Sequence, residues 1–66
     1  MKKVIIQITF TDGSVGYYKS TEIITSSKKD AKVFDKRYAE GLRDGLNFAI
    51  KTYEDASTKS AEIVEL

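Results

Sequence analysis

The sequence predicts an α+β domain with the element order strand, strand, helix, strand (ββαβ). Lys3–Thr11 alternates apolar and polar residues with the period of two that is typical of a half-buried strand. The Asp-Gly dipeptide that follows is the strongest short-range signal for a hairpin. Lys36–Glu54 has apolar residues at the spacing of an amphipathic helix. We expect a three-stranded antiparallel sheet of order 2-1-3 with the helix packed on one face.

The first strand is the most apolar of the three and is therefore placed in the centre of the sheet. Its core-facing residues are expected to be Val4, Ile6, Ile8 and Phe10. Ile5 points to the opposite face, where one tyrosine and Ile24 are also expected. Because one helix covers only one face of such a sheet, this second face either stays in water or meets a partner.

The return strand is predicted over Ser14–Ser26, and its register depends on the turn. A two-residue turn places Tyr17 beside Ile8 on the core side. A bulge near Gly16 would shift the register by one residue and exchange Tyr17 for Tyr18. We expect the register without the bulge; in both cases one tyrosine faces the core and the other is exposed.

The connection Ser26–Asp35 is predicted to contain a single helical turn, capped by Ser27 with Asp30 three residues later. Asp35 is expected to cap the main helix, because its carboxylate suits the positive end of the helix dipole. A single long helix from Lys28 is the alternative, but it would place Val33 outside the buried stripe of the helix. The residues expected to plug the end of the core are Ala31, Val33 and Phe34.

The main helix is expected to bury about a third of its circumference. The residues on this face are Tyr38, Ala39, Leu42, Leu46, Ala49, Ile50 and Tyr53. The residues left in water are Arg37, Glu40, Arg43, Asp44, Asn47 and Lys51. The final strand, Lys59–Leu66, is expected beside the first, with Ala61 and Ile63 on one side and Val64 and Leu66 on the other.

Two glycines, Gly41 and Gly45, lie inside the helix, where each costs about 1 kcal/mol relative to alanine. Phe48 points away from the apolar face. On one interpretation, Gly45 lets the helix lie close to the sheet and a loop covers Phe48. On the other, the two glycines and Phe48 form a groove and a knob for a partner.

Composition excludes most catalytic chemistry. The chain of 66 residues, a single domain over 1–66, has no cysteine and no histidine, so we expect no enzyme, no metal site and no cofactor. The N-terminal apolar run is too short and too interrupted for a signal peptide or a membrane span, so we expect no membrane partner. A chain this short is marginally stable, which makes a homodimer one alternative.

Two surfaces are candidates for binding. Basic side chains beside tyrosines are typical of single-stranded nucleic-acid binding, although Asp30 and Asp35 dilute the charge. The residues of this candidate site are Lys28, Lys29, Lys32, Lys36, Arg37 and Lys19. The residues of the alternative, a protein interface, are Phe48, Gly41, Gly45, Arg43, Ile5 and Tyr18.

Two segments, DAKVFDKRYAEGL (residues 30–42) and AEIVEL (residues 61–66), resemble small uncharacterised proteins of phages and prophages of Gram-positive bacteria. The match, which also includes the lysine-rich N-terminal strand, covers about half the chain, and its motifs are structural: a core plug, a helix cap and a strand. The resemblance implies an accessory protein of a mobile element in the bacterial cytoplasm. It also implies stoichiometric binding to a host protein, as in the anti-defence proteins of this size, anti-CRISPRs among them. The alternatives are a nucleic-acid-binding module and a homodimeric structural module.

Overall fold

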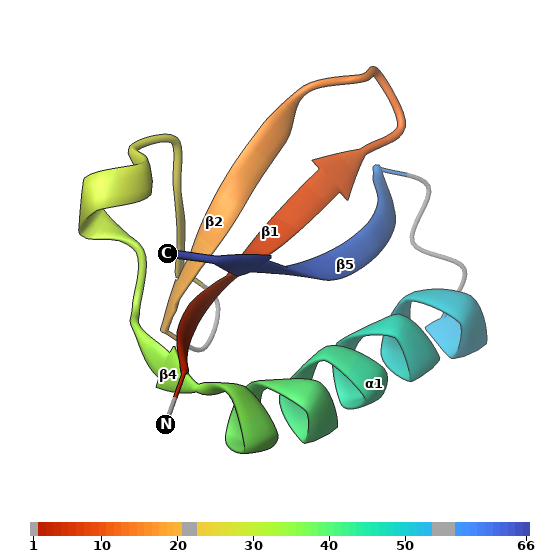
Figure 1. Cartoon of the computed structure of the whole chain (residues 1–66). Coiled ribbons are helices and arrows are strands. Elements are labelled where there is room, and N and C mark those ends of the chain that lie inside the picture. The colour runs from red at the N-terminus through yellow and green to blue at the C-terminus, as the bar shows by residue number, and fades with distance from the viewer. Residues whose placement is uncertain (1, 21–22, 54–56) are drawn as a thin grey trace.

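In the computed structural model, which describes residues 2–20, 23–53 and 57–66, one helix packs on a curved antiparallel sheet (Figure 1). The α+β class is therefore confirmed, but the sheet formed by these residues has five strands and not three. The elements in chain order are β1 (Lys3–Phe10), β2 (Val15–Ser20), β3 (Ile23–Thr25), the 3-10 turn η1 (Lys28–Asp30), β4 (Phe34–Asp35), α1 (Lys36–Tyr53) and β5 (Thr58–Glu65).

Strand β1 lies in the centre of the sheet, as its apolar sequence predicts. Strand β5 runs antiparallel along one edge of β1, from Val4 to Phe10. The other edge is shared, because β2 pairs with Gln7 to Thr9 while β4 pairs with Lys3 and Val4. The predicted order 2-1-3 holds for β2, β1 and β5, and the additional strands are β3 and β4.

The hairpin loop between β1 and β2 has three residues and not two. The Phe10 carbonyl accepts a hydrogen bond from the Gly13 N–H (3.0 Å), and the Phe10 N–H donates to the Ser14 carbonyl (2.9 Å). Gly13 has a φ of +92°, the left-handed conformation that closes a three-residue loop. Sequence alone did not reveal this extra loop residue.

The longer loop shifts the register by one residue, so the expected pairing of Tyr17 with Ile8 is wrong. Gly16 lies opposite Ile8, and Tyr17 lies opposite Gln7 on the far face. Tyr18 consequently packs against the core on the helix side, as the alternative register required.

The single return strand expected over Ser14–Ser26 is also wrong, because the chain folds back into β2 and β3. Tyr18 lies opposite Ile24 in this second hairpin. Ile24 is therefore on the helix side of the sheet and not on the far face. Folding back pairs backbone groups that a strand extending beyond β1 would leave without partners in the sheet.

The connection to the helix contains the expected single turn, η1, so one long helix from Lys28 is excluded. Ser27 occupies its N-cap position, but its side chain makes no capping hydrogen bond. Ala31 is buried and Phe34 packs on the core, as predicted. Val33 does not plug the core, since 48% of it is exposed. The expected capping of α1 by Asp35 stays a prediction, although the helix does begin at the next residue.

Helix α1 packs on β5 and β1. The buried cluster consists of Val4, Ile6, Ile8, Ala39 and Ala61, with Leu42 and Leu46 packed against it. Full burial of an aliphatic side chain such as Ile6 stabilises the fold by about 1.5–3 kcal/mol. Tyr38, expected on the buried face, is instead 64% exposed. The expected burial of Tyr53 lies outside the described side chains.

The far face of the sheet is not open at its centre. Ile5 is fully buried although it does not belong to the cluster around Ala39.

The polar side of α1 also differs from expectation, because Arg43 and Asn47 are half-buried and not fully in water. The predicted end of the helix, Glu54, lies outside the described residues.

Candidate binding surface

Three aromatic rings from three different elements form a continuous row. The ring centroids of Tyr18 (β2) and Phe34 (β4) are 5.8 Å apart, with planes tilted by 46°. Phe34 and Tyr38 (α1) are stacked, with centroids 5.6 Å apart and planes 19° from parallel. Tyr18 and Phe34 are half-buried against the core, and Tyr38 is largely exposed. The row therefore leads from the core to the surface.

The topology explains how these residues meet. The three-residue loop turns Tyr18 toward the helix side, and pairing of β4 with β1 sets Phe34 opposite Val4. Tyr38 follows Phe34 by four residues, just inside α1. The sequence signal was present in this spacing, but the helical pattern assigned Tyr38 to the buried face.

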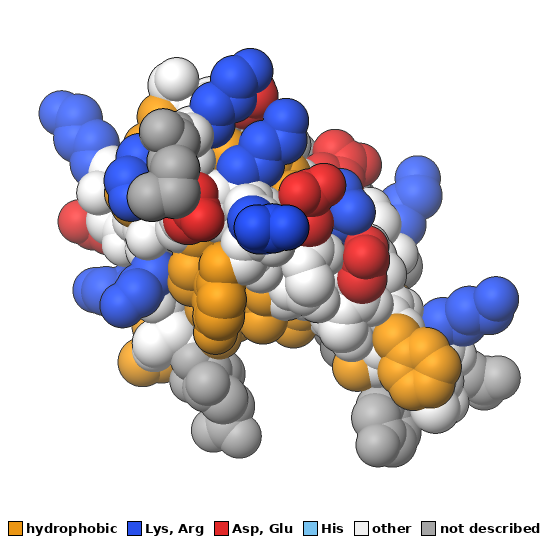
Figure 2. Space-filling model, turned by 60° about the horizontal axis from the view of Figure 1, so that its bottom comes forward, with side chains coloured by type: hydrophobic (Ala, Val, Ile, Leu, Met, Phe, Trp, Pro, Cys, Tyr) orange, Lys and Arg blue, Asp and Glu red, His pale blue; other side chains and the backbone are white. Residues whose placement is uncertain are grey.

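Ile24 extends the row on the side of β3. It lies opposite Tyr18, and 45% of it is exposed. A Cβ on Gly16 would come within 2.6 Å of Ile24 Cγ2, so the Ile24 side chain lies directly over the β2 backbone. We call Tyr18, Ile24, Phe34 and Tyr38 the aromatic surface. Figure 2, which shows one face of the molecule, has hydrophobic side chains gathered near its lower centre, with lysine, arginine and acidic side chains mainly above them.

A second feature runs along α1 from Tyr38. Tyr38, Gly41, Gly45 and Phe48 are spaced by three, four and three residues, so they follow one line along the helix. Phe48 is 71% exposed. A Cβ on either glycine would meet nothing within 4 Å. We call these four residues the glycine stripe.

The exposed stripe decides between the two interpretations of the helix. Gly45 does not bring the helix close to the sheet, because the space beside it is open. Phe48 is not covered by a loop within the described residues. Both observations contradict the first interpretation and leave the stripe available for contact.

Two residues of the predicted protein interface belong neither to the aromatic surface nor to the glycine stripe. Ile5 is fully buried and cannot touch a partner. Arg43 is half-buried and binds its neighbour Asp44, with Arg43 Nη2 3.0 Å from Asp44 Oδ1. The helical turn places Arg43 on the opposite side of α1 from the stripe. The remaining predicted residues, Phe48, Gly41, Gly45 and Tyr18, lie in the two features described above.

The predicted nucleic-acid residues are spread over separate elements. Lys28 and Lys29 are in η1, Lys32 follows it, and Lys19 is exposed on β2. Lys36 and Arg37 line a surface pocket at the start of α1, together with Lys2, Asp35 and Glu40. Acidic side chains therefore lie among the lysine and arginine side chains in the structure, as they do in the sequence.

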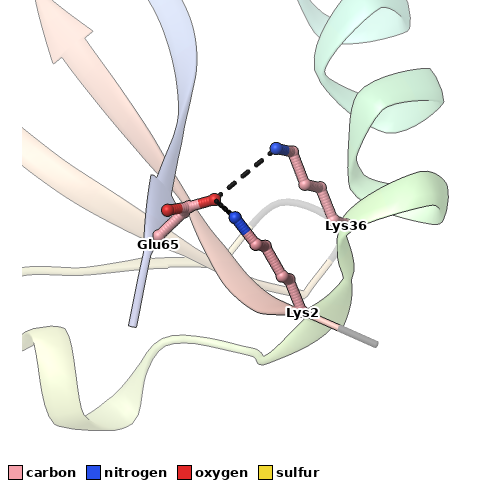
Figure 3. A network of polar contacts seen from close by, with 3 residues as sticks. All are labelled: Lys2, Lys36 and Glu65. Atoms are coloured by element: carbon pink, nitrogen blue, oxygen red, sulfur yellow. Dashed lines mark hydrogen bonds and ion pairs between the residues drawn. The ribbon is translucent and has the colours of Figure 1, made fainter.

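Lys36 is also engaged in an ion-pair network. Lys2 Nζ and Lys36 Nζ lie 3.3 Å and 3.5 Å from the same carboxylate oxygen of Glu65 (Figure 3). The hydrogen bond from Lys2 is the main cause that lowers the pKa of Glu65 below its ordinary value. These contacts join the start of β1, the start of α1 and the end of β5, but they are exposed and contribute little to stability.

The part of the chain that the structure describes contains no group of three acidic side chains arranged to hold a metal ion. Asp12 has a lowered pKa, but the cause is local: its carboxylate accepts hydrogen bonds from the Ser14 hydroxyl (2.6 Å) and the Ser14 N–H (2.9 Å). No described helix has the length and apolar character needed to cross a membrane. The features that remain are the aromatic surface and the glycine stripe.

Comparisons of the chain with protein-family models, with curated proteins and with solved structures found no match in any of the three.

Proposed function

We propose that this chain is a non-enzymatic binding protein that acts by stoichiometric contact with another protein, and that the aromatic surface is its binding site. The observation that carries the proposal is the row Tyr18–Phe34–Tyr38, which leaves its outer ring 64% exposed. Exposed aromatic rings held by packing are the residues that protein interfaces favour, because they supply large contact area at low cost in conformational entropy.

The surroundings indicate the chemistry of the partner. Lys28, Lys29 and Lys32 take part in no ion pair within the described residues, and they lie on the segment that leads into Phe34. Lys32 is tied to the aromatic surface through its N–H, which donates to the Tyr18 carbonyl (3.0 Å). An apolar segment with acidic flanks would match this surface. On this proposal the partner is a protein of a bacterial host, bound in the cytoplasm by a phage- or mobile-element-encoded inhibitor of the anti-defence class.

The experiment is capture from a bacterial lysate, with and without nuclease, using the wild-type chain, Tyr38→Ser and Val15→Thr. Val15 is a matched control, because it is also exposed but lies opposite Thr9 on the other face of the sheet. Capture of a stoichiometric protein that survives nuclease, is lost in Tyr38→Ser and is kept in Val15→Thr supports the proposal. Equal capture by both variants contradicts it.

Nuclease separates this proposal from the nucleic-acid alternative. If nuclease abolishes capture, the alternative based on Lys28, Lys29, Lys32, Lys36, Arg37 and Lys19 replaces the proposal. Gel shifts at two salt concentrations would then have to weaken with salt, because neutralised phosphates release counterions.

A further inference from the structure

We infer that the glycine stripe of α1 binds a second copy of this chain, with the two helices antiparallel about a two-fold axis. This inference concerns a different surface from the proposed binding site and does not depend on it; the two surfaces share only Tyr38.

The glycine stripe has the same order of residue types in both directions along α1. Gly41 and Gly45 lie two residues on either side of position 43, and Tyr38 and Phe48 lie five residues on either side. An antiparallel pair centred on this position sets each Tyr38 opposite Phe48 of the second copy, and each Gly41 opposite Gly45 of the second copy. In a two-fold interface the same patch of each copy meets itself, and the order aromatic, glycine, glycine, aromatic fits such a contact because each ring meets a ring and each glycine meets a glycine.

The glycine stripe also leaves steric room for a second helix. The two glycines give two helices a flat strip on which their backbones can approach closely. No described residue of the chain packs on this strip, since a Cβ on either glycine would meet no atom within 4 Å. Crossing helices diverge away from their closest point, and the aromatic rings at the two ends of the stripe would fill the widening space.

The two rings at the ends of the stripe supply apolar contact area. Tyr38 and Phe48 are 64% and 71% exposed. With about 200 Å² for a whole aromatic side chain, the four rings of a dimer would bury roughly 500 Å². That is about half of the smallest area, near 1,000 Å², that a specific interface needs, and neighbouring atoms of α1 have to supply the remainder. We therefore expect a weak dimer that dissociates on dilution.

The dimer would also change the proposed binding site. Tyr38 is the exposed end of the aromatic row, and it would meet Phe48 of the second copy. Because this contact covers the exposed part of Tyr38, a partner that binds through Tyr38 would compete with the second copy.

The first test is sedimentation equilibrium of the whole chain over a hundredfold range of concentration, with thermal unfolding of the same samples. The variants are Gly45→Ala and, as a control, Glu40→Ala, an exposed position away from the stripe. We expect the wild type and Glu40→Ala to dimerise at high concentration. Gly45→Ala should dimerise at least tenfold more weakly while its monomer unfolds at a higher temperature, because alanine favours the helix.

This pair of readouts separates a lost interface from a lost fold. A wild-type chain that stays monomeric at every concentration overturns the inference. Dimerisation that Gly45→Ala leaves unchanged also overturns it, because the glycine would then have no part in the contact.

The second test reads the orientation of the helices. The chain has no cysteine, so Tyr38→Cys and Phe48→Cys each introduce a single thiol and leave both glycines in place. On oxidation of an equimolar mixture, we expect disulfides between the two variants in preference to disulfides within either. Preferential self-pairing of each variant would show parallel helices and would contradict the antiparallel arrangement.

Discussion

The side-chain amide of Asn47 forms two hydrogen bonds with the backbone of Ala61. Asn47 Nδ2 donates to the Ala61 carbonyl (3.0 Å), and the Ala61 N–H donates to Asn47 Oδ1 (2.8 Å). Ala61 lies in the middle of β5, opposite Ile8 of β1. The amide thus supplies to β5 the donor and the acceptor that a neighbouring strand would supply. Because the backbone groups of Ala61 are already hydrogen-bonded, this part of the β5 edge cannot pair with a strand of another chain.

We expect Asn47→Ala to destabilise the fold by about 1–3 kcal/mol, because both backbone groups of Ala61 lose their partners in a half-buried place. Urea unfolding measures the loss. Asn47→Asp, which keeps the acceptor but loses the donor, should also be destabilised, and Thr52→Ala on the exposed side of α1 should be nearly neutral. Equal stability of Asn47→Ala and the wild type would contradict a structural role for the amide.

Gly16 and Gly45 should respond to alanine in opposite directions. The Cβ of Gly16→Ala would lie 2.6 Å from Ile24 Cγ2, so we expect a loss of about 1–3 kcal/mol from overpacking. Gly45→Ala meets open space and should stabilise the monomer by up to about 1 kcal/mol. Thermal unfolding at low protein concentration compares the two.

A double-mutant cycle identifies the cause of the loss at Gly16. Ile24→Ala removes the Cγ2 methyl, so Gly16→Ala should cost less in its presence than in the wild type. An unchanged cost would show that the clash with Ile24 is not responsible.

Gly13 should tolerate asparagine better than alanine. Its φ of +92° is unfavourable for residues with a Cβ, although a side chain there would meet no atom within 4 Å. We expect Gly13→Ala to lose about 1 kcal/mol or more, and Gly13→Asn to lose less, because asparagine adopts the left-handed conformation more readily. Urea midpoints of the two variants give the answer, and equal losses would rule out backbone strain as the cause.

Acid should destabilise the fold through Asp12 and Glu65. The pKa of each carboxyl is lowered in the folded state, so the stability that it contributes is present above the ordinary carboxyl pKa and is lost as pH falls through the folded-state pKa. Because both carboxylates are exposed, we expect the loss of stability in urea unfolding between pH 6 and pH 3 to be small, and carbon NMR titrations report both groups directly.

Added salt should affect the lowered pKa values of Glu65 and Asp12 differently, because the two pKa values are lowered by different causes. High salt should raise the pKa of Glu65 toward its ordinary value, because the exposed Lys2 and Lys36 charges are screened. The pKa of Asp12 should respond less, because hydrogen bonds from Ser14 lower it, and Ser14→Ala should raise it. A pKa of Asp12 that follows salt as closely as that of Glu65 would contradict this assignment.

Much of the candidate site was visible in the sequence only as unconnected residues. The pattern of α1 predicted that Phe48 lies off the buried face, and the structure confirms its exposure. Tyr18 is a candidate in the sequence, but the expected hairpin register places it on the far face of the sheet and not on the helix side. Ile24, Phe34 and Tyr38 were not recognised as surface residues of one site, because they meet only when β3 and β4 join the sheet.

By itself the sequence determined the α+β class, the central place of β1, the start of α1 and the pairing of β5 with β1. The elements follow from hydrophobic periodicity, which acts within one element at a time. The place of β1 and its pairing with β5 follow from burying the most apolar strand in the centre of the sheet. Tertiary structure decided the three-residue loop, the fold-back of β3, the shared edge of β1 and the row of aromatic rings. The physical reason is that backbone groups far apart in the chain compete for the same partners, and only the assembled sheet fixes which of them pair.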